Sequence, residues 1–187
     1  MPHHDHPASP PSTAWHHRPN HLHVCGRTYM VTASTLGHQQ IFTGSRRLTL
    51  LHDTLMECMA HHRWDLVAWA VLPNHYHVIA TSADEACHLR EAIQELHSRT
   101  AREVNRIDGV KARRVWFQYW DTCISFSSSL YARIGYVMEN PVKHGLATDA
   151  TEYPWGCSWW FKHNLDQAML RRIRSYRWDR VKIPDNF

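Results

Sequence analysis

Residues Trp69–Ser82 read WAVLPNHYHVIATS, and this stretch decides the fold. The mostly apolar run Trp64–Leu72 predicts a buried strand, Pro73 and Asn74 predict a turn, and His75–Thr81 predicts a second strand that returns beside the first. The pattern therefore indicates a β-hairpin whose second strand begins with two histidines, two residues apart.

Two amphipathic helices flank this hairpin. Apolar residues recur every three or four positions in Arg46–His62 and again in Asp84–Arg106. A strand rich in β-branched and aromatic residues, GRTYMVTAST, follows Cys25, and an aromatic strand, WFQYWDTCI, follows the second helix. The order β-α-β-β-α-β predicts an α+β fold with a ferredoxin-like antiparallel sheet and its helices on one face.

A third helix is expected at Ser127–Glu139, after this core. The serine run predicts its N-cap, and the segment NPVKHG predicts its end, because a residue that precedes proline avoids helical backbone angles.

The length of 187 residues fits one domain with appendages. Residues 1–22 are rich in His and Pro and predict a disordered tail, residues 23–163 form the domain, and residues 164–187 form a basic C-terminal extension. The net charge of +4 permits an anionic partner without requiring one.

The cysteine pattern and the hydropathy exclude several classes of protein. The five cysteines contain no CxxC pair, so neither a disulfide framework nor a structural zinc site is indicated. No apolar run reaches about 18 residues and no signal peptide is evident, which favours a cytoplasmic protein without a membrane partner.

His75 and His77 are expected to project from the same side of their strand, with Tyr76 on the other side. Two adjacent imidazoles form half of a metal site, and neutral imidazole is a common metal ligand. The alternative is an exposed strand face that carries two histidines by chance, in a chain that has 17 of them.

A second group of polar residues lies in YVMENPVKHGL, residues 136–146. Tyr136 and Asn140 stand four apart and therefore share one helix face. A tyrosine hydroxyl can act as a covalent nucleophile if it is activated, and a divalent metal can polarise a scissile phosphate. The alternative is a core tyrosine that packs beside Ile134 and Val137.

The segment LPNHYHVI, followed about 60 residues later by YVMENPVKHGL, resembles the single-tyrosine HUH transposases. The resemblance is greatest to the branch of REP-associated tyrosine transposases, whose hallmarks are a P-x-H-x-H strand and a Tyr-x-x-x-Asn-Pro helix end. It spans roughly residues 26–160.

This resemblance implies a metal-dependent nuclease and strand transferase that acts on single-stranded or hairpin DNA. His75 and His77 match the metal ligands, with Mg²⁺ or Mn²⁺ as the expected ion, and Asn140 matches the residue that completes the metal site. Tyr136 matches the nucleophile, which would form a 5′-phosphotyrosine link. Tyr131 is a rival nucleophile, but five residues along a helix place it roughly 140° away around the axis. The family leaves open whether the protein is a monomer or a homodimer.

DNA contacts are expected from basic and aromatic side chains. The family's N-terminal signature for reading hairpins is reduced here to Gly26, Arg27 and Thr28, which departs from the pattern. The candidate DNA-binding residues are Arg27, Lys111, Arg113, Arg114, Trp116, Arg171, Arg172 and Arg174.

Two other functions remain open at the level of the sequence. One is a domesticated protein that binds single-stranded DNA without cleaving it. The other is a metal-dependent phosphodiesterase that activates water in place of tyrosine.

Overall fold

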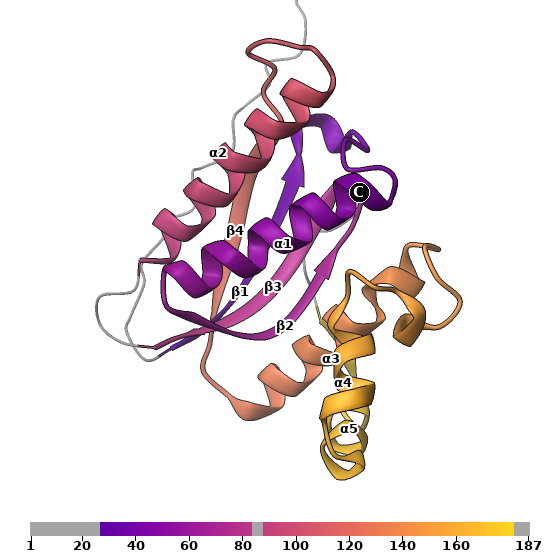
Figure 1. Cartoon of the computed structure of the whole chain (residues 1–187). Helices are drawn as coiled ribbons and strands as arrows, with labels where there is room; N and C mark the ends of the chain where they lie inside the picture. Colours follow the sequence, from indigo (N-terminus) through magenta and orange to yellow (C-terminus); the bar gives the residue numbers. More distant parts are fainter. Residues whose placement is uncertain (1–26, 84–87, 182–187) are drawn as a thin grey trace, which may run out of the picture.

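The computed structural model describes residues 27–83 and 88–181, and its centre is one four-stranded sheet (Figure 1). Its strands lie in the order β2-β3-β1-β4, and every neighbouring pair is antiparallel. The strands are β1 (Thr28–Thr35), β2 (Trp64–Val71), β3 (His75–Ser82) and β4 (Trp116–Ile124). With α1 between β1 and β2 and α2 between β3 and β4, this is the predicted ferredoxin-like sheet.

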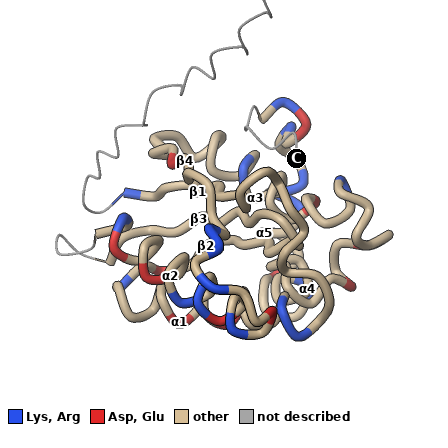
Figure 2. Tube along the Cα trace, turned by 90° about the horizontal axis from the view of Figure 1, so that it is seen from above, with Lys and Arg blue, Asp and Glu red and all other residues tan. Residues whose placement is uncertain are grey.

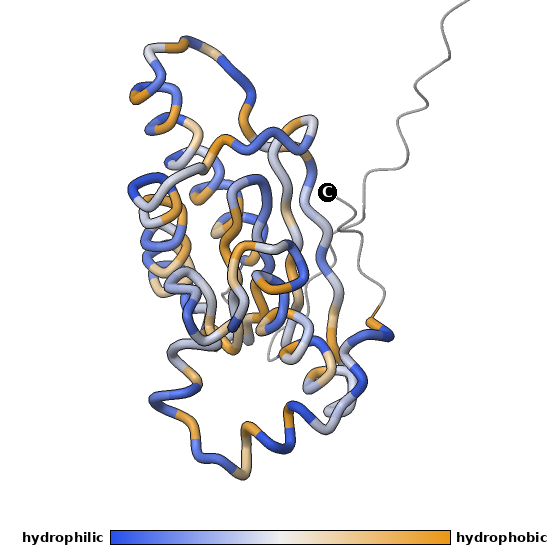
Figure 3. The backbone as a smooth tube through the Cα atoms, turned by 90° about the vertical axis from the view of Figure 1, so that its right-hand side faces the viewer, coloured by the Kyte–Doolittle hydropathy of each residue, from blue (hydrophilic) through white to orange (hydrophobic). Residues whose placement is uncertain are grey.

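Helices α1 (Ser45–His61) and α2 (Leu89–Ile107) cover one face of the sheet. Their buried residues recur every three or four positions, so each helix turns an apolar stripe toward the strands. Figure 3 shows hydrophobic residues recurring along the helices and strands. On this side Tyr76 of β3 contacts His97 of α2 through its hydroxyl, at 3.0 Å, and the His97 ring stacks on Trp116 at 4.4 Å.

The other face of the sheet is covered in part by α3 (Ser127–Lys143) and by the C-terminal helices. These are α4 (Cys157–Asn164) and α5 (Gln167–Arg174), and short 3₁₀ turns lie at Leu36–His38, Ala150–Glu152 and Trp178–Arg180. The two helices of the core, α1 and α2, therefore lie on one face as predicted, and the helices that follow β4 pack on the other face.

Helix α3 is longer than predicted and passes through Pro141 to Lys143. Proline removes one hydrogen-bond donor near the end of the helix, the amide that would otherwise bond to the Val137 carbonyl. The helix nevertheless continues, because Asn140 and Pro141 are both buried and the His144 amide bonds to the Asn140 carbonyl at 3.1 Å. The N-cap also differs from the prediction, since it is Phe126 and no side chain caps the helix.

The basic C-terminal segment is folded as far as it is described. Asp166 caps α5 by accepting a hydrogen bond from the Met169 amide, and Leu170 and Ile173 are buried in the core shared with α3. The His- and Pro-rich stretch 1–22 lies outside the described residues. Within the residues described, no helix is both long and apolar enough to cross a membrane.

Replacing His97 with Gln should make the fold less sensitive to acid. Burial lowers the pKa of His97 to about 3, whereas an unfolded histidine titrates near 6.5. The unfolded state then binds a proton that the folded state does not, so the free energy of unfolding falls as the pH drops below about 6.5. For this group the loss between pH 7 and pH 5 is roughly 2 kcal/mol.

Urea titrations at both pH values measure this loss, which should be smaller for His97→Gln than for the parent chain. His163 is exposed, so His163→Gln should lose as much stability as the parent. An undiminished loss in His97→Gln would contradict the assignment.

Candidate functional site

His75 and His77 project from the same face of β3, toward α3, and both are fully buried. Tyr76 between them points to the opposite face, into the core under α1 and α2. The two imidazole rings meet edge to face with their centroids 5.1 Å apart. The alternation of the strand therefore produces a histidine pair, and this pair is not on an exposed face.

Hydrogen bonds from neighbouring segments fix both rings. Thr32 of β1 lies opposite His77 in the sheet, and its hydroxyl is 2.8 Å from His77 Nδ1. The Asn74 side chain donates to the His38 carbonyl, so its oxygen faces His75 Nδ1, at 2.7 Å. His75 Nδ1–H therefore donates to Asn74, which leaves Nε2 as the basic nitrogen of the neutral ring.

Burial keeps both imidazoles neutral. It lowers the pKa of His75 to about 3, aided by the charge of His144, while hydrogen bonding by Asn140 works in the opposite direction. Burial likewise lowers the pKa of His77 well below its usual value, and the charge of His75 adds to the effect. Neutral imidazole is the form that binds a metal ion.

Helix α3 brings three polar side chains to this pair at intervals of four residues. The Tyr136 ring centroid lies 5.4 Å from that of His77, and the His144 ring lies 4.7 Å from that of His75. Asn140, between them on the same face, is fully buried. The helix thus sets a phenol, a carboxamide and a third imidazole against the two histidines of the strand.

Lys143 lies beside the phenol. Its ammonium group donates a hydrogen bond to the Tyr136 hydroxyl at 3.2 Å and lies 5.0 Å from the centre of the ring. Burial lowers the pKa of Lys143. Only 4% of the Tyr136 surface is accessible to solvent. Lys143 itself lies at the surface, so its side chain helps to shield the Tyr136 hydroxyl from solvent.

Tyr131 occupies a different environment. Its ring stacks on Tyr176 with centroids 5.2 Å apart, and the Arg172 guanidinium lies 4.7 Å from the ring centre. Tyr131 therefore packs between α3 and the C-terminal segment, whereas Tyr136 contacts the histidine pair. The two tyrosines therefore have different neighbours, as their spacing predicts.

Sequence reasoning missed His144, Lys143 and Thr32 as neighbours of the site. His144 could have been found, because it extends the spacing of Tyr136 and Asn140 by a further four residues on the same helix face. Thr32 could not, because its place opposite His77 depends on the register between β1 and β3.

The predicted DNA-binding residues of the first strand and the basic loop divide into two groups. Arg27, Lys111 and Arg114 are exposed. Arg113 pairs with Asp108 at 2.6 Å and with Asn105 at 2.8 Å, which fastens the loop to α2. Trp116 has 6% of its surface exposed, and both His97 and Phe42 stack against it. Trp116 is therefore a core residue, and the expectation that it stacks on DNA bases needs correction.

The remaining candidates, Arg171, Arg172 and Arg174, are exposed on α5. Helix α5 carries three arginines and no acidic residue, whereas Figure 2 shows basic and acidic residues interspersed along α1 and α2. Helix α5 packs against α3, which carries Tyr136, and Arg174 lies near the acidic residues Glu139 and Asp149.

The donor set fits a divalent metal ion. Two neutral imidazoles and a carboxamide oxygen are side chains that bind such ions, and all three residues are fully buried. His75, His77 and Asn140 are the residues that would hold the ion.

Comparison with known proteins finds similarity in sequence and in fold to REP-associated tyrosine transposases. A search against models of protein families gave no match. The chain is 24% identical over 136 residues to the REP-associated tyrosine transposase of Escherichia coli K12, a match that covers 71% of this chain and 76% of the relative. A solved structure of a REP-associated tyrosine transposase bound to a REP hairpin superimposes with a TM-score of 0.65 at 19% identity, over 91% of this chain and 94% of the other.

Nitrogen NMR should find His75 neutral, with its proton on Nδ1, from pH 7 down to pH 5. The reasons are the acceptor oxygen of Asn74 and a pKa lowered by burial to about 3. Long-range ¹H–¹⁵N spectra distinguish this tautomer from the others. An imidazolium signal for His75 at pH 6, or a proton on Nε2, would contradict the site geometry. Asn74→Ala, which removes the acceptor, should shift the tautomer balance.

Proposed function

We propose that this chain, which resembles the REP-associated tyrosine transposases in sequence and in fold, cleaves and rejoins single-stranded or hairpin DNA with Tyr136 as nucleophile. The observation that carries the proposal is the contact of Tyr136 with His77, with ring centroids 5.4 Å apart, between segments about 60 residues apart in the sequence. A core tyrosine needs no such neighbours, whereas a phosphodiester-cleaving site needs a nucleophile beside metal-binding groups.

His75, His77 and Asn140 would hold Mg²⁺ or Mn²⁺ in this proposal. When bound there, the ion would polarise the scissile phosphate and neutralise developing charge. The protein supplies the fixed rings: Asn74 orients His75, and Thr32 orients His77. Side chains behind metal ligands typically change metal affinity by about 10- to 100-fold.

The covalent step conserves the phosphodiester bond energy. The Tyr136 oxygen attacks phosphorus, the bond to the 3′ oxygen breaks, and the leaving oxygen gains a proton to become a 3′-hydroxyl. The product is a 5′-phosphotyrosine link. Attack on this link by another 3′-hydroxyl restores both the tyrosine and a DNA strand, so the protein can join strands without an external energy source.

Lys143 is suited to support the phenolate form of the nucleophile. Its positive charge lies 3.2 Å from the oxygen that must lose a proton, at the edge of a buried site where charges interact strongly. The DNA phosphate must approach the same oxygen, so Lys143 has to move off the hydroxyl while remaining close to it.

DNA would approach from the side of β4 and α5. Thr32 lies opposite His77 on one side and Trp120 of β4 on the other, so the partly exposed Trp120 shares the face of the histidines and can stack on a base. The exposed arginines Arg27, Arg114, Arg171, Arg172 and Arg174 and Lys111 supply phosphate contacts.

Tyr136→Phe should abolish covalent attachment of DNA and leave DNA binding unchanged, because only the nucleophilic oxygen is lost. Denaturing gels of the chain incubated with labelled hairpin DNA and Mn²⁺ report attachment, and gel shifts without denaturant report binding. Tyr131→Phe is the matched control and should still form the adduct. Cleaved DNA without an adduct in the parent chain would point to water as the nucleophile, and binding without cleavage would point to a DNA-binding protein.

Lys143→Met should slow adduct formation on the order of 10²-fold, since it removes a charge placed to stabilise the phenolate. Lys143→Arg should recover most of the rate. Single-turnover rates at saturating DNA separate this effect from binding. If Lys143 only covers Tyr136, both variants would instead react at the parent rate or faster.

A further inference from the structure

A second group of potential metal ligands lies on the opposite side of the sheet from the histidine pair. It consists of His61 and His62, where α1 ends, and Glu95 in the middle of α2, and their ligand atoms all lie within 4.8 Å of one another. His62 Nε2 is 2.8 Å from a Glu95 carboxylate oxygen, and the two imidazole rings meet edge to face at 4.9 Å. The three side chains join two helices that are far apart in sequence.

These donors match a first-row transition ion such as Zn²⁺. Tetrahedral zinc with bonds of about 2.0–2.1 Å separates its ligand atoms by roughly 3.3 Å, so the present spacings require only small side-chain movements. His61 is exposed, and His62 and Glu95 are partly exposed, which gives an ion access from solvent.

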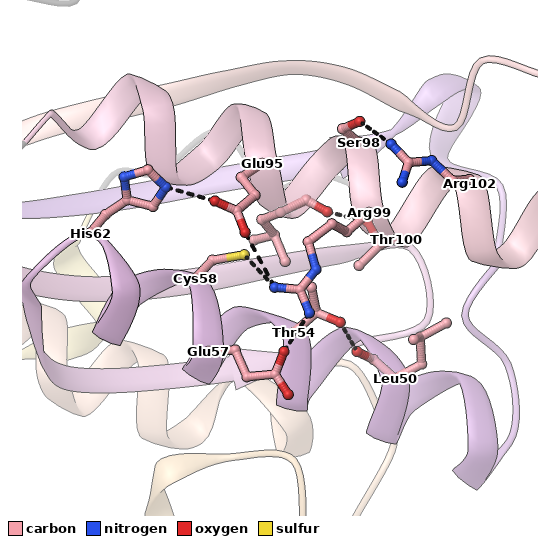
Figure 4. A network of polar contacts seen from close by, with 11 residues as sticks. Leu50, Thr54, Glu57, Cys58, His62, Glu95, Ser98, Arg99, Thr100 and Arg102 are labelled. Carbon is pink, nitrogen blue, oxygen red and sulfur yellow. Dashed lines mark hydrogen bonds and ion pairs between the residues drawn. The ribbon is translucent and has the colours of Figure 1, made fainter.

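The Glu95 carboxylate is already held in place by hydrogen bonding to Arg99. Figure 4 shows His62 and Glu95 pointing toward one another from α1 and α2, with Arg99 behind the carboxylate. Arg99 donates to the other Glu95 oxygen at 3.3 Å, to the Cys58 sulfur at 3.6 Å and to Glu57. One carboxylate oxygen thus remains directed at His62 while its partner is anchored, as is typical of carboxylates that bind metals.

The local charge also favours a cation. Arg99 contributes one positive charge, but Glu57 and Glu95 contribute two negative charges, so a divalent ion would enter a negative environment.

We propose that His61, His62 and Glu95 form a zinc site that clamps α1 to α2, with a fourth position left to water. The site is separate from the proposed nuclease centre, because it lies on the other face of the sheet. Its role would be to stabilise the layer that supports β3 from behind.

Thermal unfolding of the full chain with and without Zn²⁺ tests this site. A ligand stabilises a protein only through preferential binding to the folded state, so zinc held equally by histidines of the folded and unfolded chain leaves the midpoint unchanged. At a zinc concentration about 100-fold above the dissociation constant, the midpoint should rise by roughly 5–10 °C. His61→Ala should lose most of that rise, since His61 is exposed and alanine continues the helix.

Two further variants make the result specific. Glu95→Gln keeps the size of the side chain and should also lose most of the rise, whereas His163→Ala removes an unrelated exposed histidine and should keep it. An equal zinc-induced rise in parent, His61→Ala and Glu95→Gln, or no rise in the parent, would overturn the proposal. DNA attachment by Tyr136 is measured separately, so neither result decides the proposed function.

Discussion

The burial of His75 and His77 on one face of β3 is the constraint on which the rest of the structure depends. Buried imidazoles are costly unless their nitrogens find partners, and here Thr32 and Asn74 supply partners for the two Nδ1 atoms. Both partners depend on the register of β1 and β3 and on the turn before β3. A shift of one residue would turn Tyr76 toward α3 and place the histidines among the aliphatic side chains under α1 and α2.

The two faces of the sheet consequently differ in composition: one is mainly apolar and the other carries the polar residues of the candidate site. The face under α1 and α2 is an apolar core, in which the polar atoms of Tyr76 and His97 contact one another. The other face combines an apolar cluster with the polar group of Tyr136, Asn140 and the histidine pair. Packing on the first face holds β3 in position. Helix α3 then packs on the other face so that Tyr136 and Asn140 face the two histidines.

Much of the fold could be predicted from local patterns in the sequence. The period of two in HYHVIATS gave the two faces of β3. The helical period gave both ends of α1 and the C-terminal end of α2 to within one residue, while the predicted start of α2 at Asp84 lies outside the described residues. The predicted end of α3 was wrong because it relied on Pro141. A residue before proline usually avoids helical backbone angles, but the burial of Asn140 outweighs that preference here. Trp116 looked like a surface aromatic beside a basic loop, yet it fills the space between α2 and the sheet. Contacts of that kind depend on long-range packing, which a single sequence does not display.

Peptide mapping of the protein–DNA adduct tests the central claim most directly. Trypsin cleaves after Arg133 and Lys143, so residues 134–143 form one peptide that contains Tyr136 and no other tyrosine, while Tyr131 lies in the preceding peptide. After nuclease and trypsin digestion, mass spectrometry should find a nucleotide phosphate on the peptide 134–143. A nucleotide on the peptide that contains Tyr131, or no modified tyrosine although DNA is cleaved, would contradict the assignment of Tyr136 as the nucleophile.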